Sequence, residues 1–428
     1  METRRGNSAP ASLQYTIDVA PLEQSMNQSG TSAGSGSSSS RSERIVNSNT
    51  STPSDSSSPS VENMNMIKWH PFVDLLFDRR DKHQLLLDLR KAALEGDVTD
   101  KIMDKMKNNR NLLGAAITEE HETVFHIVEG AKQTHFVEQM IKLIGEEQKD
   151  YLKFQNKQCN TAFCFAAMAG SKEIAQAMLN EDESLLTIRG GKGMTPLYLA
   201  TLFGQRETAL FLYDEMKRQS KAQEQLKQHR KAIFYASVDS TLYDIALKLL
   251  NDDQENELAG ACYMVDKTTM TALLRLAQTP LHLLDQTIES EETSLSNQAL
   301  ELVKNLWEKI LEKEGKKIWD YFLSNKNVLF DAAHLGNYRF LAELIRLYPD
   351  LVHLLDQKNR TIFHIAIMYR HANLFNLIYE IGFNKQLVAS YKDIDGNSIL
   401  HLAAKSPDAR QDSSVPPCPV QLLKCSKS

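Results

Sequence analysis

A short phrase returns along this chain at nearly constant spacing. Each copy has a hydroxyl residue first, an apolar residue third, a His, Cys or Tyr fourth and usually an Ala sixth. The copies begin at Thr123, Thr161, Thr195, Thr361 and Ser398, so the first three lie 38 and 34 positions apart and the last two 37 apart. A repeat of roughly 33 to 38 residues indicates a stack of supersecondary units, each burying its apolar face against its neighbours.

The residue types in the phrase predict the start of a helix. A Thr side chain at a helix N-cap accepts a hydrogen bond from a backbone N–H that has no partner within the helix. Pro196 follows Thr195 at the first helical position, where a missing N–H costs nothing. A second, outer helix is predicted from apolar spacing in each unit, for example at Ile174, Met178 and Leu179.

Three histidines, His126, His364 and His401, occupy the fourth position of their copies. One interpretation is structural: they cap the helix and hydrogen-bond to the next repeat. The other is functional, as metal ligands or general bases. Because they fall one per repeat, we expect them about a repeat apart, which favours the structural interpretation.

Weaker copies at Arg230–Ala236, Thr271–Ala277 and Asn327–Asn337, with an opening unit at Asp88–Asp97, extend the array to eight or nine units. We therefore divide the chain into six segments. These are a Ser-rich disordered tail (1–62), an N-terminal capping segment (63–87), a first repeat block (88–277), an insertion with an amphipathic helix (278–320), a second repeat block (321–404) and an irregular tail (405–428). The helix of the insertion either forms a binding feature or packs on the array and lengthens it.

Composition narrows the function classes. A net charge of -6 and a pI near 6.1 offer no general attraction for nucleic acid or anionic lipid. The five cysteines are scattered without a CxxC pair, so Cys159 and Cys164 are expected in core or turn positions, and the chain suits a reducing compartment. No secretory signal or transmembrane run is evident, which predicts a cytoplasmic chain. No catalytic motif occurs, so we expect no enzyme activity, cofactor, metal or small-molecule substrate.

The phrase and its period resemble ankyrin repeats, which implies an all-α solenoid of helix pairs joined by short β-hairpin loops, and a protein-binding function. Asn160–Ala167, Gly190–Tyr198 and Asp395–Ala404 further resemble plant ankyrin proteins of the accelerated-cell-death type. In that family the array is followed by a PGG domain of transmembrane helices, and membership implies stress or immune signalling. This chain departs from the family after Ala404 and looks like a truncated isoform, with Pro407 opposing a further helix.

Two readings follow from the resemblance. The chain is either an interaction module in plant stress or immune signalling, or the cytosolic portion of a PGG-type membrane regulator. The first implies association with full-length membrane relatives and hence peripheral placement at the plasma membrane. At the cut end we expect a frayed last unit, 397–404, with exposed apolar surface.

The hairpin loop at Gly190–Met194 is the best-defined candidate site. Its glycines suggest a phosphate-binding loop. In such a loop a Ser or Thr follows the Lys, whereas Gly193 follows Lys192 here, and no Gly stands at the required upstream position. The phase of the repeats instead predicts a loop tip on the concave face of the array. We expect partner contacts from this tip and the helix after it, at Arg189, Lys192, Met194, Thr201 and Phe203.

Overall fold

The computed structural model describes residues 69–73, 80–96, 99–131, 133–253, 258, 272–279, 292–314, 319, 322–323, 325–382 and 384–405. The predicted tail 1–62 and residues 406–428 lie outside the described part, as do residues 63–68 and 74–79 of the predicted capping segment. The division into six segments stays a prediction.

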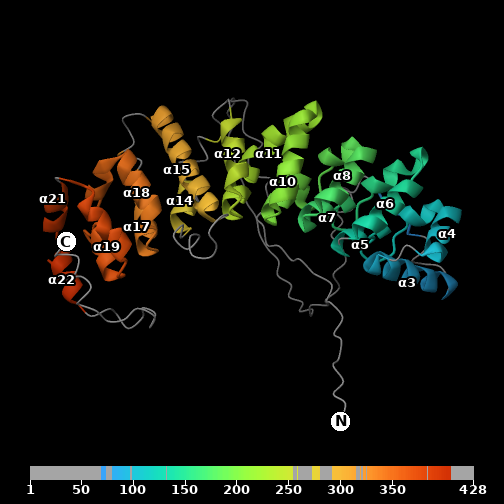
Figure 1. The fold of residues 1–428 in the computed structure, drawn as a ribbon, viewed down its shortest axis with the longest axis horizontal. Coiled ribbons are helices and arrows are strands. Elements are labelled where there is room, and N and C mark those ends of the chain that lie inside the picture. The colour runs from blue at the N-terminus through green and yellow to red at the C-terminus, as the bar shows by residue number, and fades with distance from the viewer. Residues whose placement is uncertain are drawn as a thin grey trace, which may run out of the picture.

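The chain forms an arch of paired helices, and no named strand occurs among the described residues (Figure 1). One helix of each pair lines the concave side: α3 (Arg80–Glu95), α5 (Val124–Ala131), α7 (Ala162–Ala169), α9 (Pro196–Leu202), α11 (Ser220–Asp239), α14 (Ala272–Gln278), α17 (Asn327–His334), α19 (Ile362–Met368) and α22 (Ile399–Ala404). The outer partners are α4 (Asp100–Asn108), α6 (Thr134–Leu143), α8 (Lys172–Glu181), α10 (Arg206–Arg218), α12 (Tyr243–Asn251), α15 (Glu292–Glu314), α18 (Tyr338–Leu347) and α20 (Ala372–Asn376).

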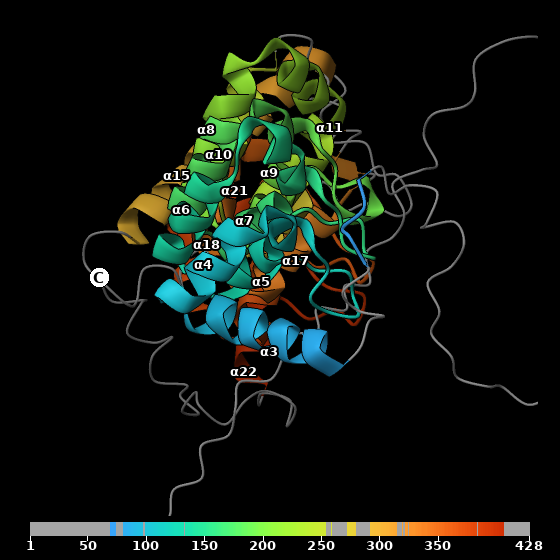
Figure 2. The ribbon, with the colours of Figure 1, turned by 90° about the vertical axis from the view of Figure 1, so that its right-hand side faces the viewer.

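Each repeat packs mainly on its sequence neighbours, as a solenoid requires. Inner helices contact inner helices along the whole row, from α3 and α5 to α19 and α22, and outer helices contact outer helices. A single apolar cluster runs between the two rows, from Leu86 to Leu402. The view along the array shows the outer helices on one side and the loops on the other (Figure 2). The predicted all-α solenoid is confirmed.

The phrase begins its helices as predicted. The hydroxyl oxygens of Thr161, Thr195 and Thr361 accept hydrogen bonds from the backbone N–H three residues later, at 3.2, 3.2 and 3.4 Å. Pro196 is the first residue of α9. Local sequence therefore determines where these inner helices start.

Short 3-10 turns connect four of the outer helices, α4, α6, α8 and α18, to the loops that follow them: η1 (Arg110–Gly114), η2 (Glu146–Lys153), η3 (Glu183–Thr187) and η7 (Pro349–His353). The loops that follow close like hairpins, each through one backbone bond. The N–H of Asn156 donates to the carbonyl of Asn160 at 2.9 Å, and that of Gly190 to Met194 at 2.7 Å. The loops 356–360 and 393–397 repeat this bond.

Helix α15, predicted as part of an insertion, packs between α12 and α18 in the outer row, beside its inner partner α14. Its apolar face is fully buried, with Trp307 against Phe322 and Tyr348 at ring-centroid distances of 5.5 and 6.1 Å. Of the two readings of this helix, packing on the array is the one the structure shows.

The outer helix around Leu374 and Ile378 is shorter than its equivalents. Helix α20 ends at Asn376 and continues as the 3-10 turn η8 (Leu377–Tyr379), followed by α21 (Asn384–Ser390). In α22, Leu400 is 79 % exposed while its neighbours Ile399 and Leu402 are buried. Apolar exposure is thus present in this unit, and its fraying stays a prediction.

Candidate functional site

Equivalent backbone bonds place the inner helices in register. The N–H of Ser171, Gln205, Leu242 and His371 donates to Ala166, Ala200, Ser237 and Ala366 respectively, each five residues earlier. By this register His126, Cys164, Tyr198, Tyr235, Phe330 and His364 are equivalent residues, one per repeat. The residue type at the fourth position of the phrase therefore differs from repeat to repeat along the array.

At His126 this position connects two repeats. Its Nδ1 accepts from the Thr123 N–H at 3.1 Å, so the proton of the neutral ring is on Nε2, which lies 3.0 Å from the Asn160 carbonyl in the next loop. Burial lowers the pKa of His126 to about 4, so the ring is neutral at pH 7. The structural interpretation of this histidine is confirmed.

His364 repeats the contact with its own cap, because the Thr361 N–H donates to its Nδ1 at 3.2 Å. Burial likewise lowers the pKa of His364. Within the described part of the chain, no group of three or more His, Cys, Asp or Glu residues could hold a metal ion. Burial also raises the pKa of the Cys159 and Cys164 thiols, which keeps them protonated and unreactive.

A second apolar cluster lies outside the main core, on the side of α7 and α9 that faces away from the outer helices. We call it the α7–α9 patch. Cys164, Met194 and Leu199 form its buried base, and half-buried side chains pack over them: Met168, Tyr198, Leu202 and Phe203. Positions 198, 199, 202 and 203 share one face of α9, opposite the core-facing Leu197 and Ala200.

The concave face becomes polar beyond α9. At the position of Leu202, α11 carries Asp239, which pairs with Arg275 of α14. The Arg275 guanidinium also lies over the Tyr235 ring, 5.1 Å from its centroid. Gln278 in turn donates to the Asp331 carboxylate of α17 at 2.8 Å. These residues bond to one another across repeats, whereas the α7–α9 patch presents apolar atoms.

The loop before α9 brings two basic side chains to the edge of the patch. Arg189 and Lys192 are both exposed, and an Arg189 nitrogen donates to the Gln228 side chain at 3.2 Å. Lys192 has φ 55°, a left-handed conformation at the loop tip. The Gly191 N–H donates to the Asn160 side chain at 2.8 Å, so this amide connects two loops. The predicted loop tip is confirmed in its geometry.

The five residues predicted as partner contacts do not form one exposed surface. Arg189 and Lys192 are exposed, and Phe203 is half-buried in the patch. Met194 is only 9 % exposed and lies in the buried base. Thr201 is fully buried, and its hydroxyl donates to the Tyr198 carbonyl at 2.8 Å, so this side chain offers no surface to a partner.

Sequence reasoning missed Met168, Tyr198 and Leu202. A signal for them was present in the sequence, because α7 and α9 are apolar on every face (AFCFAAMA and PLYLATL). A helix packed on one side only is expected to carry polar residues on the other. Their apolar second face thus marks the patch.

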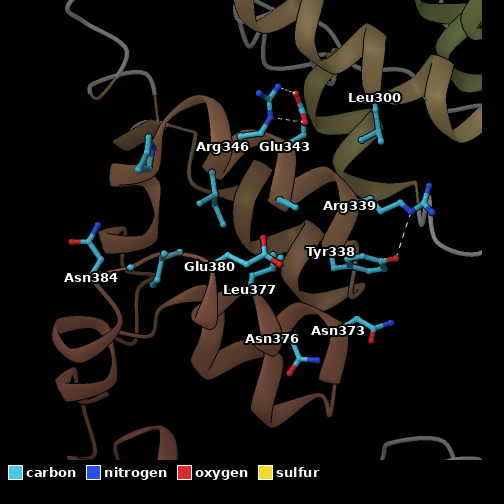
Figure 3. Close-up of a pocket in the computed structure, with 15 residues that line it drawn as sticks. Leu300, Tyr338, Arg339, Glu343, Arg346, Asn373, Asn376, Leu377, Glu380 and Asn384 are labelled. Carbon is cyan, nitrogen blue, oxygen red and sulfur yellow. Dashed lines mark hydrogen bonds and ion pairs between the residues drawn. The ribbon is translucent and has the colours of Figure 1, made fainter. Parts of the chain in front are cut away.

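A separate cleft of about 940 Å³ opens on the outer face, between α18, α20 and α21 (Figure 3). Leu300, Ala342 and Leu377 contribute its apolar lining, and it opens where α20 gives way to the 3-10 turn η8. Of its charged lining residues, Arg346 donates to Glu343 at 3.2 Å.

No helix in the described part of the chain is long and apolar enough to cross a membrane.

Comparison with known proteins agrees with the repeats. A family model for ankyrin repeats in three copies matches residues 113–225, so ankyrin repeats are present in this chain. No curated protein sequence matches it. Arrays of this kind typically serve as protein-interaction modules rather than as enzymes.

Two solved structures are similar to parts of the chain. A chain in the crystal structure of the yeast ribosomal protein Rps3 in complex with its chaperone Yar1 is 21% identical, with a TM-score of 0.29, and the match covers 32% of this chain and 95% of that one. The human ASB11 ankyrin repeat domain is 14% identical, with a TM-score of 0.31, and the match covers 49% of this chain and 82% of that one. At TM-scores this low, neither similarity supports a conclusion about the function of this chain.

Proposed function

We propose that this chain is a non-catalytic protein-interaction module that binds a partner through the α7–α9 patch and the adjoining loop. The observation that carries the proposal is the second apolar face of α7 and α9. Apart from Tyr198, which also packs against the main core, this face contributes no side chain to that core, and large apolar side chains left half-buried in a concave surface mark interaction sites.

The chemistry of the patch indicates the kind of partner. Tyr198, Phe203 and Met168 belong to the residue types enriched at interface cores, and Arg189 at the edge belongs to them as well. The exposed Arg189 and Lys192 favour acidic residues on the partner beside its apolar anchor, because complementary charge increases the association rate and selects the orientation. A segment that presents apolar side chains flanked by Asp or Glu fits both features.

The test compares three forms of the full chain in crosslinked pull-downs with quantitative mass spectrometry. Leu202→Asp places a charge in the patch. Met368→Asp is the matched control, because Met368 occupies the same position on α19, outside the patch. We expect the saturable partner to be lost with Leu202→Asp and retained with Met368→Asp. Equal retention by both variants, with unchanged circular dichroism, would contradict the placement of the site.

The loop is tested separately with the double variant Arg189→Glu, Lys192→Glu. Both side chains are exposed, so the fold should be unaffected. If acidic residues of the partner contact this loop, association should slow markedly at low salt, with a smaller difference at high salt because salt screens charges. An unchanged association rate would remove Arg189 and Lys192 from the site.

For the biological setting we propose plant stress or immune signalling. The proposal is supported by the resemblance of segments 160–167, 190–198 and 395–404 to plant ankyrin proteins of the accelerated-cell-death type. The alternative is the cytosolic portion of a PGG-type membrane regulator. Pull-downs from plant membrane and soluble fractions, run separately, address both. A PGG-containing relative recovered from membranes would support association at the plasma membrane, and a partner confined to the soluble fraction would favour a cytoplasmic adaptor. A hydrophobic block encoded after Ala404 in the natural transcript would favour the alternative.

A further inference from the structure

The loops of the first repeats present a row of equivalent backbone amides. In each loop, one residue lies directly before the residue whose N–H closes the hairpin. The backbone N–H groups of both its neighbours already donate to carbonyls within the same repeat. Ala116 lies between Ala115, bonded to Leu112, and Ile117, bonded to Glu122. Gln155 and Arg189 occupy the same place in the next two loops, before Asn156 and Gly190. The hairpin itself uses none of these three amides.

The segment Trp69–Val73 occupies the first two of these positions. The Ala116 N–H donates to the Phe72 carbonyl at 2.8 Å, and the Gln155 N–H donates to the Trp69 carbonyl at 3.0 Å. Phe72 also donates to the Gly114 carbonyl at 3.0 Å. The blue trace of this segment lies among the loops in the view along the array (Figure 2). The segment therefore runs across the repeats, from one loop to the next.

The interval between the two contacts is three residues, and this number has a geometric reason. Three extended residues span about 10 Å, at roughly 3.3 Å per residue. Helices of neighbouring repeats pack about 8–10 Å apart. Pro71 suits such a segment, since it favours an extended backbone and its missing N–H is not needed for either contact.

Side chains strengthen both contacts. The Phe72 ring packs edge-on against Tyr151 and Phe154, with centroids 5.4 and 5.6 Å away. The Lys153 ammonium lies over the Trp69 ring, 5.3 Å from its centroid. A large apolar side chain thus recurs at every third residue of the segment.

Arg189 is the third amide of the row. Its N–H has no acceptor among the described residues, although its carbonyl accepts from the Gln155 side chain at 3.2 Å. Counting back three residues from Trp69 reaches Met66, again a large apolar residue. We propose that the loop 188–194 is a docking site for residues 64–68 of this chain, with the Met66 carbonyl accepting from the Arg189 N–H.

The row has no fourth position for the segment to reach. Helix α11 begins at Ser220, directly after the C-cap of α10, so no hairpin separates these two helices. The first turns of α11 instead contact the turn η3 just before the third loop, where the Gln225 side chain donates to the Thr187 carbonyl at 2.9 Å. A strap of three contacts, at Phe72, Trp69 and Met66, therefore matches the number of loops available.

Docking there would have a consequence for binding. The loop 188–194 carries the exposed Arg189 and Lys192, so the docked segment and a partner that uses this loop would compete. The docking itself does not depend on the proposed function, because it concerns contacts within one chain.

The test is amide hydrogen exchange of the full chain, resolved to the fragment around Arg189. The variant Met66→Lys removes the apolar side chain and adds a positive charge facing a basic loop. Ile67→Lys makes the same change one position out of register and is the matched control. We expect the Arg189 amide to exchange roughly tenfold faster in Met66→Lys than in the wild type, the effect of losing one hydrogen bond and its packing. Ile67→Lys should leave its rate unchanged.

The amides of Gln155 and Gly190 serve as internal references, since they report the second strap contact and the folding of the loop. Both should keep their wild-type rates in both variants. Equal Arg189 exchange in the wild type and Met66→Lys would overturn the proposal, and so would equal acceleration by Ile67→Lys.

Discussion

Protonation of His126 should destabilise the fold at mildly acidic pH. The ring is 3 % exposed, and its pKa is about 4 in the folded chain against 6.5 ordinarily. The folded state therefore resists the proton that the unfolded state accepts. The contribution to stability is complete above pH 6.5 and is lost as pH falls toward 4. The loss amounts to about 2 kcal/mol at pH 5 and about 3 kcal/mol below pH 4.

The variant His126→Cys isolates this contribution, because Cys164 occupies the equivalent position in the next repeat beside its own capping Thr161. At pH 7 the variant should be less stable by roughly 1–2 kcal/mol, since it loses the bond to the Asn160 carbonyl and some packing. At pH 5 this deficit should vanish. Other histidines with lowered pKa, such as His364, remain in both forms and cancel in the difference.

The assay is urea unfolding of both forms at pH 7, 6 and 5, followed by circular dichroism. The quantity of interest is the difference in free energy of unfolding between wild type and variant at each pH. A difference that stays constant across this range would refute the reasoning, because it would show that His126 keeps an ordinary pKa in the folded chain.

Two further substitutions, each with a control variant, test how the array is built. Trp307→Ala should lower the free energy of unfolding by about 3–5 kcal/mol, as expected for a fully buried aromatic side chain. Lys304→Ala, on the exposed side of α15, should change it by less than about 0.5 kcal/mol. Thermal unfolding of both variants checks this, and a small effect of Trp307→Ala would show that α15 is dispensable to the array. Gly191→Ala would place a Cβ 2.5 Å from the Gln158 carbonyl oxygen, a backbone atom that cannot move freely, and should lower stability by roughly 1–3 kcal/mol. In Gly193→Ala the Cβ would meet no atom within 4 Å, so only its positive φ adds cost, and equal melting temperatures for the two glycine variants would contradict the close contact between the loops.

Several features were predictable from sequence because their causes are local. The phrase specifies a helix cap, an inner helix and a loop within about ten residues. The Thr161, Thr195 and Thr361 caps accordingly appear where predicted. Position in the repeat also predicted the inter-repeat contact of His126, since one repeat is followed by another of the same shape.

The contact residues of the site were only partly predictable from the sequence, because their causes are not local. Thr201 and Met194 belong to residue types that can serve at an interface, but burial depends on which face of α9 the neighbouring repeats cover. Tyr198 stands where other repeats carry a structural histidine, so its type alone did not predict that it would lie half-buried over a second apolar cluster. Packing partners from three different repeats decide these positions.

What the sequence by itself determined is the repeat: its period, its helix starts, its loops and hence the all-α solenoid. These follow from capping, proline and apolar spacing over short stretches of chain. Only the tertiary structure decided that α15 joins the outer row, that the second apolar face of α7 and α9 remains half-buried, and that Phe72 packs on Tyr151 and Phe154. Each of these depends on contacts between residues distant in sequence, whose free energy appears only when the repeats are stacked.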